Sequence, residues 1–401
     1  SNFSDDLKTT TSNIIATLLE AALDQTKNTG KYGGDFTHRI LDAHRDISQD
    51  TINSLCDKLY TDISKFNQLI ERSLIVLQGY DDTSRVANLL TEYQDLRLDL
   101  IELSSRLREL VLEPSDQSVY WIEKSFDGRD KKLRSAPINV GPLLTDHLYK
   151  STDSIVMTSA TLSTNKTFDY LINTTNFSPD TEAILGSPFN YHNSSLLIIP
   201  TDVPTPQSEN YMEYVTTNII QSGTAAGGRT MALFTSHSAV RQAFNLLNKK
   251  MQDSNIAVLA QGLSGPPGRL LRRFKQHPAT ILLGTSSFWE GVDLKGEALQ
   301  VLIIARLPFD VPTDPIFEAR SEQYEKPFYD YSIPRAMIKF KQGFGRLIRS
   351  HSDRGVALIL DSRIHSSNYG RRFVQCLPEM NVQQTLTSKT GDIVGTWLGT
   401  Q

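Results

Sequence analysis

The stretch ATILLGT, residues 279–285, is a near-continuous apolar run that ends in polar residues. Helical patterns separate it from five stretches of the same character: SLLIIP (195–200), RTMALFT (229–235), NIAVLA (255–260), LQVLIIA (299–305) and GVALILD (355–361). Strands that are apolar along their whole length are typical of a parallel sheet buried on both faces. The sequence therefore predicts an α/β fold in which helices cover both faces of a parallel sheet.

The N-terminal part of the chain has a helical period instead. Apolar residues recur at spacings of three and four over 51–76 and 86–112, which predicts two long helices packed antiparallel about a turn at 79–82. Pro114 ends the second helix. Two strands are expected beyond it, SVYWIEK (118–124) and SIVMTSATLS (154–163), the latter buried and running into a polar turn. The apolar seam of the second helix consists of Tyr93, Leu96, Leu100, Leu103, Leu107 and Leu110.

Composition restricts the functional classes. A chain of 401 residues has room for two or three domains, and its net charge of -4 means that any nucleic-acid surface must be a local basic patch. Cys56 and Cys376 form neither a disulfide framework nor a four-thiolate metal site, which favours a reducing, cytoplasmic setting. The apolar runs are too short to cross a bilayer, and the first ten residues do not resemble a signal peptide.

Polar residues follow several of the predicted strands: Thr235 to His237, Gly284 to Ser287, and Asp361 to Arg363. In open parallel sheets the ligand binds beyond the carboxyl ends of the strands. These positions are therefore the first candidates for a binding site.

Five motifs carry a family resemblance. TSATLS (158–163), ALFTSH (232–237), LLGTSSFWEGVDLKG (282–296), LPFDVPTDP (307–315) and QGFGRLIRS (342–350) resemble, in this order, motifs III, IV, V, Va and VI of the DinG/XPD-type superfamily 2 DNA helicases. The resemblance covers 118–378. It implies a helical arch-like insertion at 1–115, the closing part of a first RecA-like lobe at 116–185, and a second RecA-like lobe at 186–401.

Two motifs of that family are missing. The phosphate-binding loop has the form G-x-x-x-x-G-K-[ST], but here Gln25 precedes Gly30-Lys31 at the first glycine position and Tyr32 replaces the hydroxyl residue. LDAHRD (41–46) lacks the glutamate of motif II and a preceding strand, and Lys31 and His44 are expected on or near helical surfaces. The expectation is that the chain begins just after motif II and that the first helicase lobe is its partner.

The resemblance assigns the chemistry of ATP hydrolysis to QGFGRLIRS. If this stretch is helical, Arg346 and Arg349 share one face, and the resemblance makes them arginine fingers at the γ-phosphoryl group, with Gln342 near the phosphate or the attacking water. Ion pairing on a solvated helix face is the alternative. The predicted nucleotide-binding residues are Glu290, Gly291, Asp293 and Gly345. Glu290 or Asp293 is expected to pair with one of the arginines; the alternative is that these carboxylates are helix N-caps or loop residues in water.

Hydroxyl and amide side chains at the strand ends are predicted to hold DNA phosphates without reading sequence. These residues are Thr235, Ser236, Gln261, Thr285, Ser286 and Ser287. Phe288 and Trp289 either stack on a base or, as favoured here, lie in the core. The basic stretch of Arg269, Arg272, Arg273 and Lys275 lines a strand groove or is a solvated face.

In TSATLS, Thr158, Ser159 and Thr161 resemble the family's coupling between nucleotide and DNA sites, although a turn that satisfies its own backbone has the same residues. The complete enzyme implied by the resemblance uses ATP and Mg²⁺ and moves along single-stranded DNA from 5′ to 3′. Its iron-sulfur site would need four clustered cysteines, which this chain lacks, and this chain alone should not hydrolyse ATP. The alternatives are a non-catalytic nucleic-acid-binding or assembly module and a structural protein that needs no nucleotide.

Overall fold

The computed structural model describes residues 2–25, 30–32, 35–78, 85–125, 130–164, 166–285, 288 and 298–400. The chain forms two compact units. The first unit comprises Ser1–Val140 and Val311–Gln323, and the second comprises Gly141–Asp310 and Tyr324–Gln401. The segment 311–323 therefore leaves the second unit and belongs to the first.

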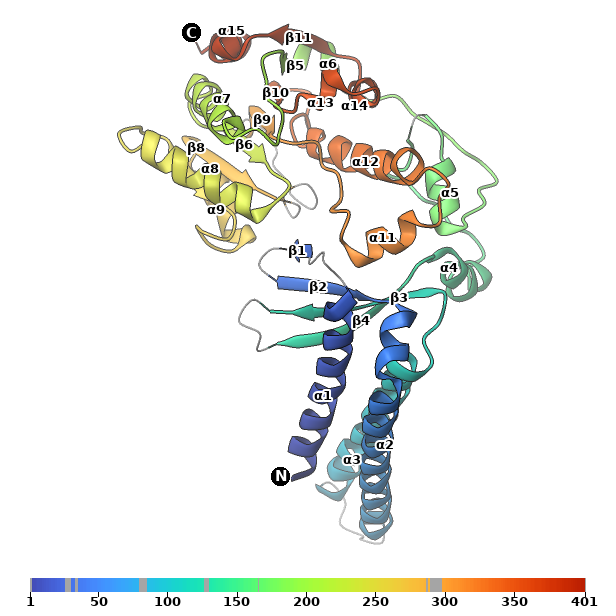
Figure 1. Ribbon diagram of the computed structural model, residues 1–401. Helices are drawn as coiled ribbons and strands as arrows, with labels where there is room; N and C mark the ends of the chain where they lie inside the picture. The colour runs from blue at the N-terminus through green and yellow to red at the C-terminus, as the bar shows by residue number, and fades with distance from the viewer. Residues whose placement is uncertain are drawn as a thin grey trace. The chain divides into compact units, whose positions relative to one another are not determined.

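The second unit is built on a parallel sheet with the strand order β11-β5-β10-β9-β6-β8-β7 (Figure 1). The six strands predicted from apolar runs are all present, which confirms the α/β prediction. A seventh strand, β11, was not predicted, because its sequence NVQQT is polar and it lies at the edge of the sheet. The strands are β5 (Ser195–Pro200), β6 (Thr230–Leu233), β7 (Ala257–Ala260), β8 (Thr280–Gly284), β9 (Val301–Ile304), β10 (Gly355–Ile359) and β11 (Asn381–Thr385).

Helices cover both faces of this sheet because side chains alternate along each strand. Leu282 and Leu302 face one side, where they pack with α9 (Pro267–Gln276), α12 (Ile333–Phe344) and α14 (Gly370–Gln375). Ile281 and Ile303 face the other, where they pack with α7 (Tyr211–Ala225), α8 (His237–Lys250) and α15 (Thr390–Leu398). The remaining short elements are α4 (Gly141–His147), η2 (Tyr149–Ser151), α5 (Asp169–Thr175), α6 (Tyr191–Ser194), η4 (Phe328–Ser332), α13 (Arg363–Ser366) and η5 (Thr387–Lys389).

The first unit combines long helices with an antiparallel sheet. Strands pair in the order β1 (Gly30–Tyr32), β2 (Asp35–Ile40), β3 (Ser118–Lys124) and β4 (Lys131–Pro137). One face of this sheet, including Tyr120 and Ile122, packs on the helices, and the other face carries Trp121, which packs with Ala319 of α11 (Pro315–Ser321). The helices are α1 (Asn2–Gln25), α2 (Asp42–Gln78) and α3 (Arg85–Leu107), which η1 (Arg108–Leu112) extends.

The two predicted long helices are confirmed as α2 and α3 with η1. Their antiparallel direction follows from two contacts, an ion pair of 2.7 Å between Arg97 and Glu71 and a hydrogen bond from Tyr60 Oη to the Ser104 carbonyl. The predicted seam is only partly buried: Leu100 and Leu107 are buried, but Leu96 and Leu103 are exposed. Because α3 packs mainly on the single helix α2, only a narrow stripe of its apolar residues is buried.

Three local predictions are wrong. Lys31 lies in strand β1 rather than near a helical surface, and LDAHRD does follow a strand, β2, although His44 lies in α2 as expected. Residues 154–159 form no strand, and Val156 is 86% exposed. An apolar segment becomes a buried strand only where neighbouring strands accept its backbone hydrogen bonds, and the described chain provides none there.

The boundaries of the units also differ from the three expected segments. The strand at 118–124 pairs antiparallel with β2 and β4 within the first unit. The second unit begins at Gly141, so residues 141–185 are grouped with the parallel sheet.

Candidate nucleotide and nucleic-acid site

A small polar cluster lies where β6, β7 and β8 end. Gln261 follows β7, and its Oε1 accepts hydrogen bonds from the backbone nitrogen of Thr285 (2.8 Å) and from Thr285 Oγ1 (3.1 Å). His237 Nε2 lies 3.5 Å from the same hydroxyl. Because β7, β8 and β6 are neighbours in the sheet, three segments that are distant in the sequence meet at one edge. Gln261 and Thr285 were predicted site residues, and His237 was predicted only as one of the polar residues that follow a strand.

Helix α8 begins at the same cluster. Ser236 is its N-cap, and Ser236 Oγ accepts the backbone N–H of Ala239 at 3.2 Å. Thr235 is half-buried beside it. This hydroxyl stabilises the start of the helix by accepting one of its free N–H groups. The first turn of a helix of this length also attracts anions through its remaining N–H groups. His237, the last residue of the polar stretch predicted after this strand, thus lies at the edge where the sequence placed a binding site.

The stretch that carries Arg346 and Arg349 is a turn, so the condition under which the two arginines would share one helix face is not met. Helix α12 ends at Phe344, and the chain continues in tight turns with hydrogen bonds from Arg346 N to Gly343 O (3.1 Å) and from Leu347 N to Phe344 O (3.0 Å). Glycines at 343 and 345 weaken the helix here. The adjacent Leu347 and Ile348 are 1% and 2% exposed and belong to the core on this face of the parallel sheet, so the turn is held against that core.

Asp353 holds the second half of this loop. Its Oδ2 accepts the backbone N–H groups of Arg349 (2.7 Å) and Ser350 (2.9 Å), and its side chain is buried. Arg346 is 8% exposed and Arg349 is half-buried. Backbone bonds to a buried carboxylate give the arginine turn a defined conformation. Sequence reasoning missed Asp353 because a carboxylate three residues beyond a motif carries no pattern of its own.

Gln342 lies on the last turn of α12. Its Oε1 is buried and accepts no hydrogen bond from any residue that the structure describes. A buried acceptor of this kind is costly to leave unpaired. We therefore expect a donor from outside the described residues, such as a ligand or a water, to bind this oxygen.

Several predicted residues lie outside the described residues. They are Ser286, Ser287, Trp289, Glu290, Gly291 and Asp293. The predicted pairing of Glu290 or Asp293 with the arginines therefore stays a prediction. Phe288 is described and is fully buried, which confirms its assignment to the core. It packs so closely over Gly284 that a Cβ there would lie 2.7 Å from its ring.

The TSATLS segment contacts helix α12, which ends just before the turn of Arg346 and Arg349. Lys341 Nζ, on α12, donates to the Ser163 carbonyl at 3.3 Å. Within the segment, Ser159 Oγ accepts the backbone N–H of Thr161 at 3.2 Å and lies 3.1 Å from its hydroxyl, while Thr158 is exposed. These bonds are those of a self-contained turn, so a coupling role for the three residues remains a prediction.

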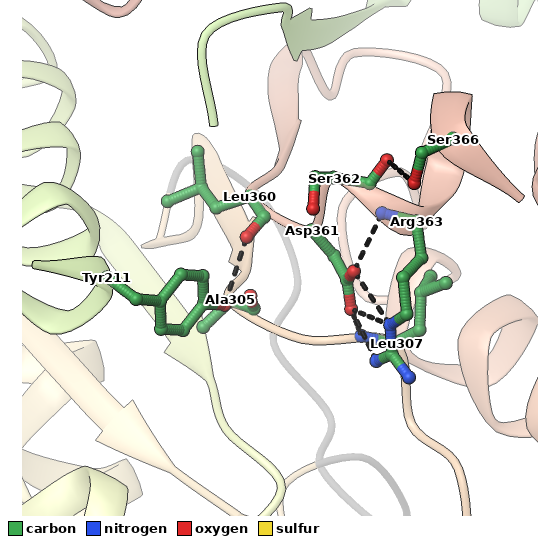
Figure 2. A network of polar contacts seen from close by, with 8 residues as sticks. All are labelled: Tyr211, Ala305, Leu307, Leu360, Asp361, Ser362, Arg363 and Ser366. Atoms are coloured by element: carbon green, nitrogen blue, oxygen red, sulfur yellow. Dashed lines mark hydrogen bonds and ion pairs between the residues drawn. The ribbon is translucent and has the colours of Figure 1, made fainter. Parts of the chain in front are cut away.

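The polar residues after β10 have a structural role (Figure 2). Asp361 is fully buried; it accepts the Leu307 backbone N–H at 2.8 Å and forms an ion pair of 2.6 Å with Arg363. The Arg363 guanidinium lies 5.2 Å from the ring centre of Phe309. Nearby, Tyr211 donates its hydroxyl to the carbonyls of Ala305 and Leu360, and burial raises the pKa of that hydroxyl. Asp361 and Arg363 thus hold the LPF turn of LPFDVPTDP in place.

Comparison with known proteins agrees with these motifs. A family model described as the helicase C-terminal domain matches residues 219–380. The 3'-5' exonuclease DinG of Bacillus subtilis is 32% identical over 88% of this chain. The ATP-dependent DNA helicase YoaA of Haemophilus influenzae is 38% identical over 65% of it. The chain belongs to the DinG/XPD-type helicase family.

The chain spans about two fifths of these curated DinG and YoaA relatives, 39% and 40% of their lengths. A solved structure named XPD_APO matches 76% of this chain and 63% of its own, with a TM-score of 0.51 and 15% identity. That likeness supports the RecA-like fold of the parallel sheet. In the described part of the chain, no helix is long and apolar enough to span a membrane.

Proposed function

We propose that this chain is the arch-like domain and second motor lobe of an ATP-dependent DNA helicase that translocates on single-stranded DNA, from 5′ to 3′. In this proposal the turn of Arg346 and Arg349 faces the ATP γ-phosphate, and Gln342 lies near the phosphate or the attacking water. The buried Oε1 of Gln342, which has no hydrogen-bond partner among the described residues and lies beside a turn with two arginines, is the observation that supports it most. Guanidinium groups suit a transferring phosphoryl group because its charge spreads over several oxygens.

The ATP phosphates and Mg²⁺ would need further residues. Lys31 lies in an antiparallel strand, whereas a phosphate-binding loop joins a strand to a helix. Among the described residues, no group of three or more His, Cys, Asp or Glu side chains is placed to hold a metal ion. We therefore assign the phosphate loop and the Mg²⁺ ligands to a first lobe, in the same polypeptide or a separate chain.

Residues 154–185 are the proposed site of that lobe's closing strands. Val156 is 86% exposed, Leu185 is 87% exposed and Ile184 is 53% exposed. Apolar residues at this exposure suit a segment that pairs with further strands. The complete enzyme, meaning this chain joined to such a first lobe, is the form in which ATP hydrolysis is expected.

The proposal is tested by comparing the chain alone with the complete enzyme, in which the first lobe comes from a relative's segment that contains a phosphate-binding loop. We expect the chain alone to bind single-stranded oligonucleotides without hydrolysing ATP, and the joined form to hydrolyse ATP faster when single-stranded DNA is added. Turnover by the chain alone would contradict the proposal. No turnover by the joined form would favour the non-catalytic module. Because one relative is named an exonuclease, the same reactions should be examined for shortening of a labelled 3′ end.

The basic helix α9 provides a second prediction. Leu270 and Phe274 are buried, whereas its basic residues are exposed. In the sequence α9 follows β7, whose carboxyl end belongs to the polar cluster, and Arg269 lies in the first turn of α9 whereas Lys275 lies in its last turn. We expect Arg269→Ala to weaken single-strand binding and to lower the slope of log affinity against log salt by about 0.7. Lys275→Ala is the matched control and should change neither quantity.

A further inference from the structure

Segment 311–323 belongs to the first unit although the residues on both sides of it belong to the second, and we call it the excursion. Its own sequence favours the start of a helix. Asp314 caps α11 by accepting the Phe317 backbone N–H at 2.7 Å, and Pro315 occupies the first turn of the helix. The chain enters the first unit after Asp310 and returns to the second unit at Tyr324. The excursion is therefore an ordered element of the first unit that is covalently part of the helicase C-terminal domain.

The middle of the excursion is fixed by contacts within the first unit. Arg320 donates from Nε to the Ile138 carbonyl (2.9 Å) and from its terminal nitrogen to the Pro137 carbonyl (3.2 Å). Arg39, on β2, binds Glu322 through two hydrogen bonds of 2.6 and 2.8 Å. The Arg39 side chain is 18% exposed and the Glu322 side chain is 53% exposed, so water screens this pair in part. Together with the Trp121 and Ala319 packing, these bonds attach α11 to the antiparallel sheet.

Aromatic rings fix the two flanks of the excursion within the second unit. Phe309 stacks on Phe328 with their ring centres 5.7 Å apart, and both rings contact Tyr369 edge to face. Tyr324 stacks on Tyr331 at 5.2 Å. Because Phe328 and Tyr331 belong to η4, which runs directly into α12, both flanks are attached to the N-terminal end of that helix.

Asp310 joins the first flank to α12 itself. Its carboxylate accepts from Arg335 Nε at 2.8 Å and forms a closer ion pair with Lys339, one turn further along the helix. The Asp310 side chain is 12% exposed. Burial alone would raise the pKa of this carboxyl, but the hydrogen bonds and charges of Arg335 and Lys339 hold it below its ordinary value. The carboxylate is thus charged at neutral pH and clamps two turns of the helix that carries Gln342.

We propose that Asp310 is a positioning residue for α12 and its arginine turn, and that segment 311–323 makes this position depend on the first unit. A strain on the antiparallel sheet is transmitted through α11 to Asp310 and from there to Gln342. This inference rests on the proposed ATP-hydrolysing function for its consequence. The linkage itself is independent of ATP and can be measured in the chain as it is.

Amide hydrogen exchange of the 401-residue chain tests the linkage. Glu322→Arg places two positive charges together, and we expect severalfold faster exchange both in β2 and in α12. The double variant Arg39→Glu/Glu322→Arg should restore part of the protection in both, because it re-forms the pair in reverse but brings a second carboxylate to Glu318, which lies 3.6 Å from Arg39 in the native chain. The control is Glu71→Arg, which breaks an Arg–Glu pair of 2.7 Å between α2 and α3 in the same unit and should leave α12 unchanged. Faster exchange in β2 together with an unchanged exchange rate in α12 would overturn the inference. If Glu322→Arg does not fold, the same measurement is made on Glu322→Gln.

The complete enzyme tests the consequence for Asp310. We expect Asp310→Asn to lower kcat for ATP by about 10- to 100-fold with little change in KM, because a misplaced arginine turn affects the transition state more than ground-state binding. Asp310→Glu should restore part of the rate. An unchanged kcat in Asp310→Asn, with an active wild type, would overturn the positioning role. Absence of turnover in the wild type would instead refute the proposed function, and the exchange experiment would still decide the linkage.

Discussion

Replacing Arg349 with alanine in the complete enzyme is expected to reduce ATP turnover by about 10³- to 10⁵-fold, the range found for arginine fingers. The guanidinium is a planar fork whose donors match phosphate oxygens, and alanine removes both the charge and the fork. Single-strand affinity should be nearly unchanged, because the predicted DNA contacts belong to the separate cluster of Gln261 and Thr285. The measurement is steady-state ATP hydrolysis with and without single-stranded DNA, alongside oligonucleotide binding.

Two variants make this result specific to the arginine at 349. Arg349→Lys keeps the charge but loses bidentate geometry, so turnover should remain strongly reduced. Arg354→Ala removes an exposed arginine five residues further on, which lies over the Trp397 ring at 4.9 Å, and should leave turnover intact. Near-normal turnover in Arg349→Ala would show that this residue does not act on the phosphoryl group.

The largest effect on stability is expected at Asp361. Asp361→Ala should lower the free energy of unfolding by about 3–5 kcal/mol, as found when one partner of a buried pair is removed. The substitution leaves the backbone N–H of Leu307 without its acceptor and the Arg363 guanidinium, whose side chain is 27% exposed, without its counter-charge. Urea unfolding of the chain measures it, with an unchanged m-value as the sign that only the native state is affected.

A matched exposed pair provides the control for Asp361. Asp146 and Lys150 form an ion pair of 2.6 Å on α4 and the adjoining turn, with side chains 57% and 67% exposed. Asp146→Ala should lower the free energy of unfolding far less than Asp361→Ala does, because water screens the pair. A loss at Asp361 no larger than the loss at Asp146 would show that the LPF turn does not depend on the buried carboxylate.

Local pattern was sufficient for the parallel sheet and the long helices. Each buried strand is apolar along its whole length, as in ATILLGT, and burial on both faces imposes that pattern residue by residue. Strand β11 has no such pattern because its residues are half-buried or exposed, so polar side chains are tolerated along it. The candidate residues Gln261 and Thr285 were also predictable, because strand ends in a parallel sheet converge on one edge whatever the intervening sequence.

The conformation of the arginine turn, by contrast, depends on distant partners. The spacing of Arg346 and Arg349 suits a helix, but burial of Leu347 against Gly355 and capture of the backbone by Asp353 produce a turn. The place of α11 is decided in the same way. The sequence of α11 predicts only that a short helix begins after Asp314. Contacts with Trp121, Ile138 and Arg39 decide that this segment belongs to the first unit. Periodicity reports which side of an element is buried, and it contains no information about the partner that buries it.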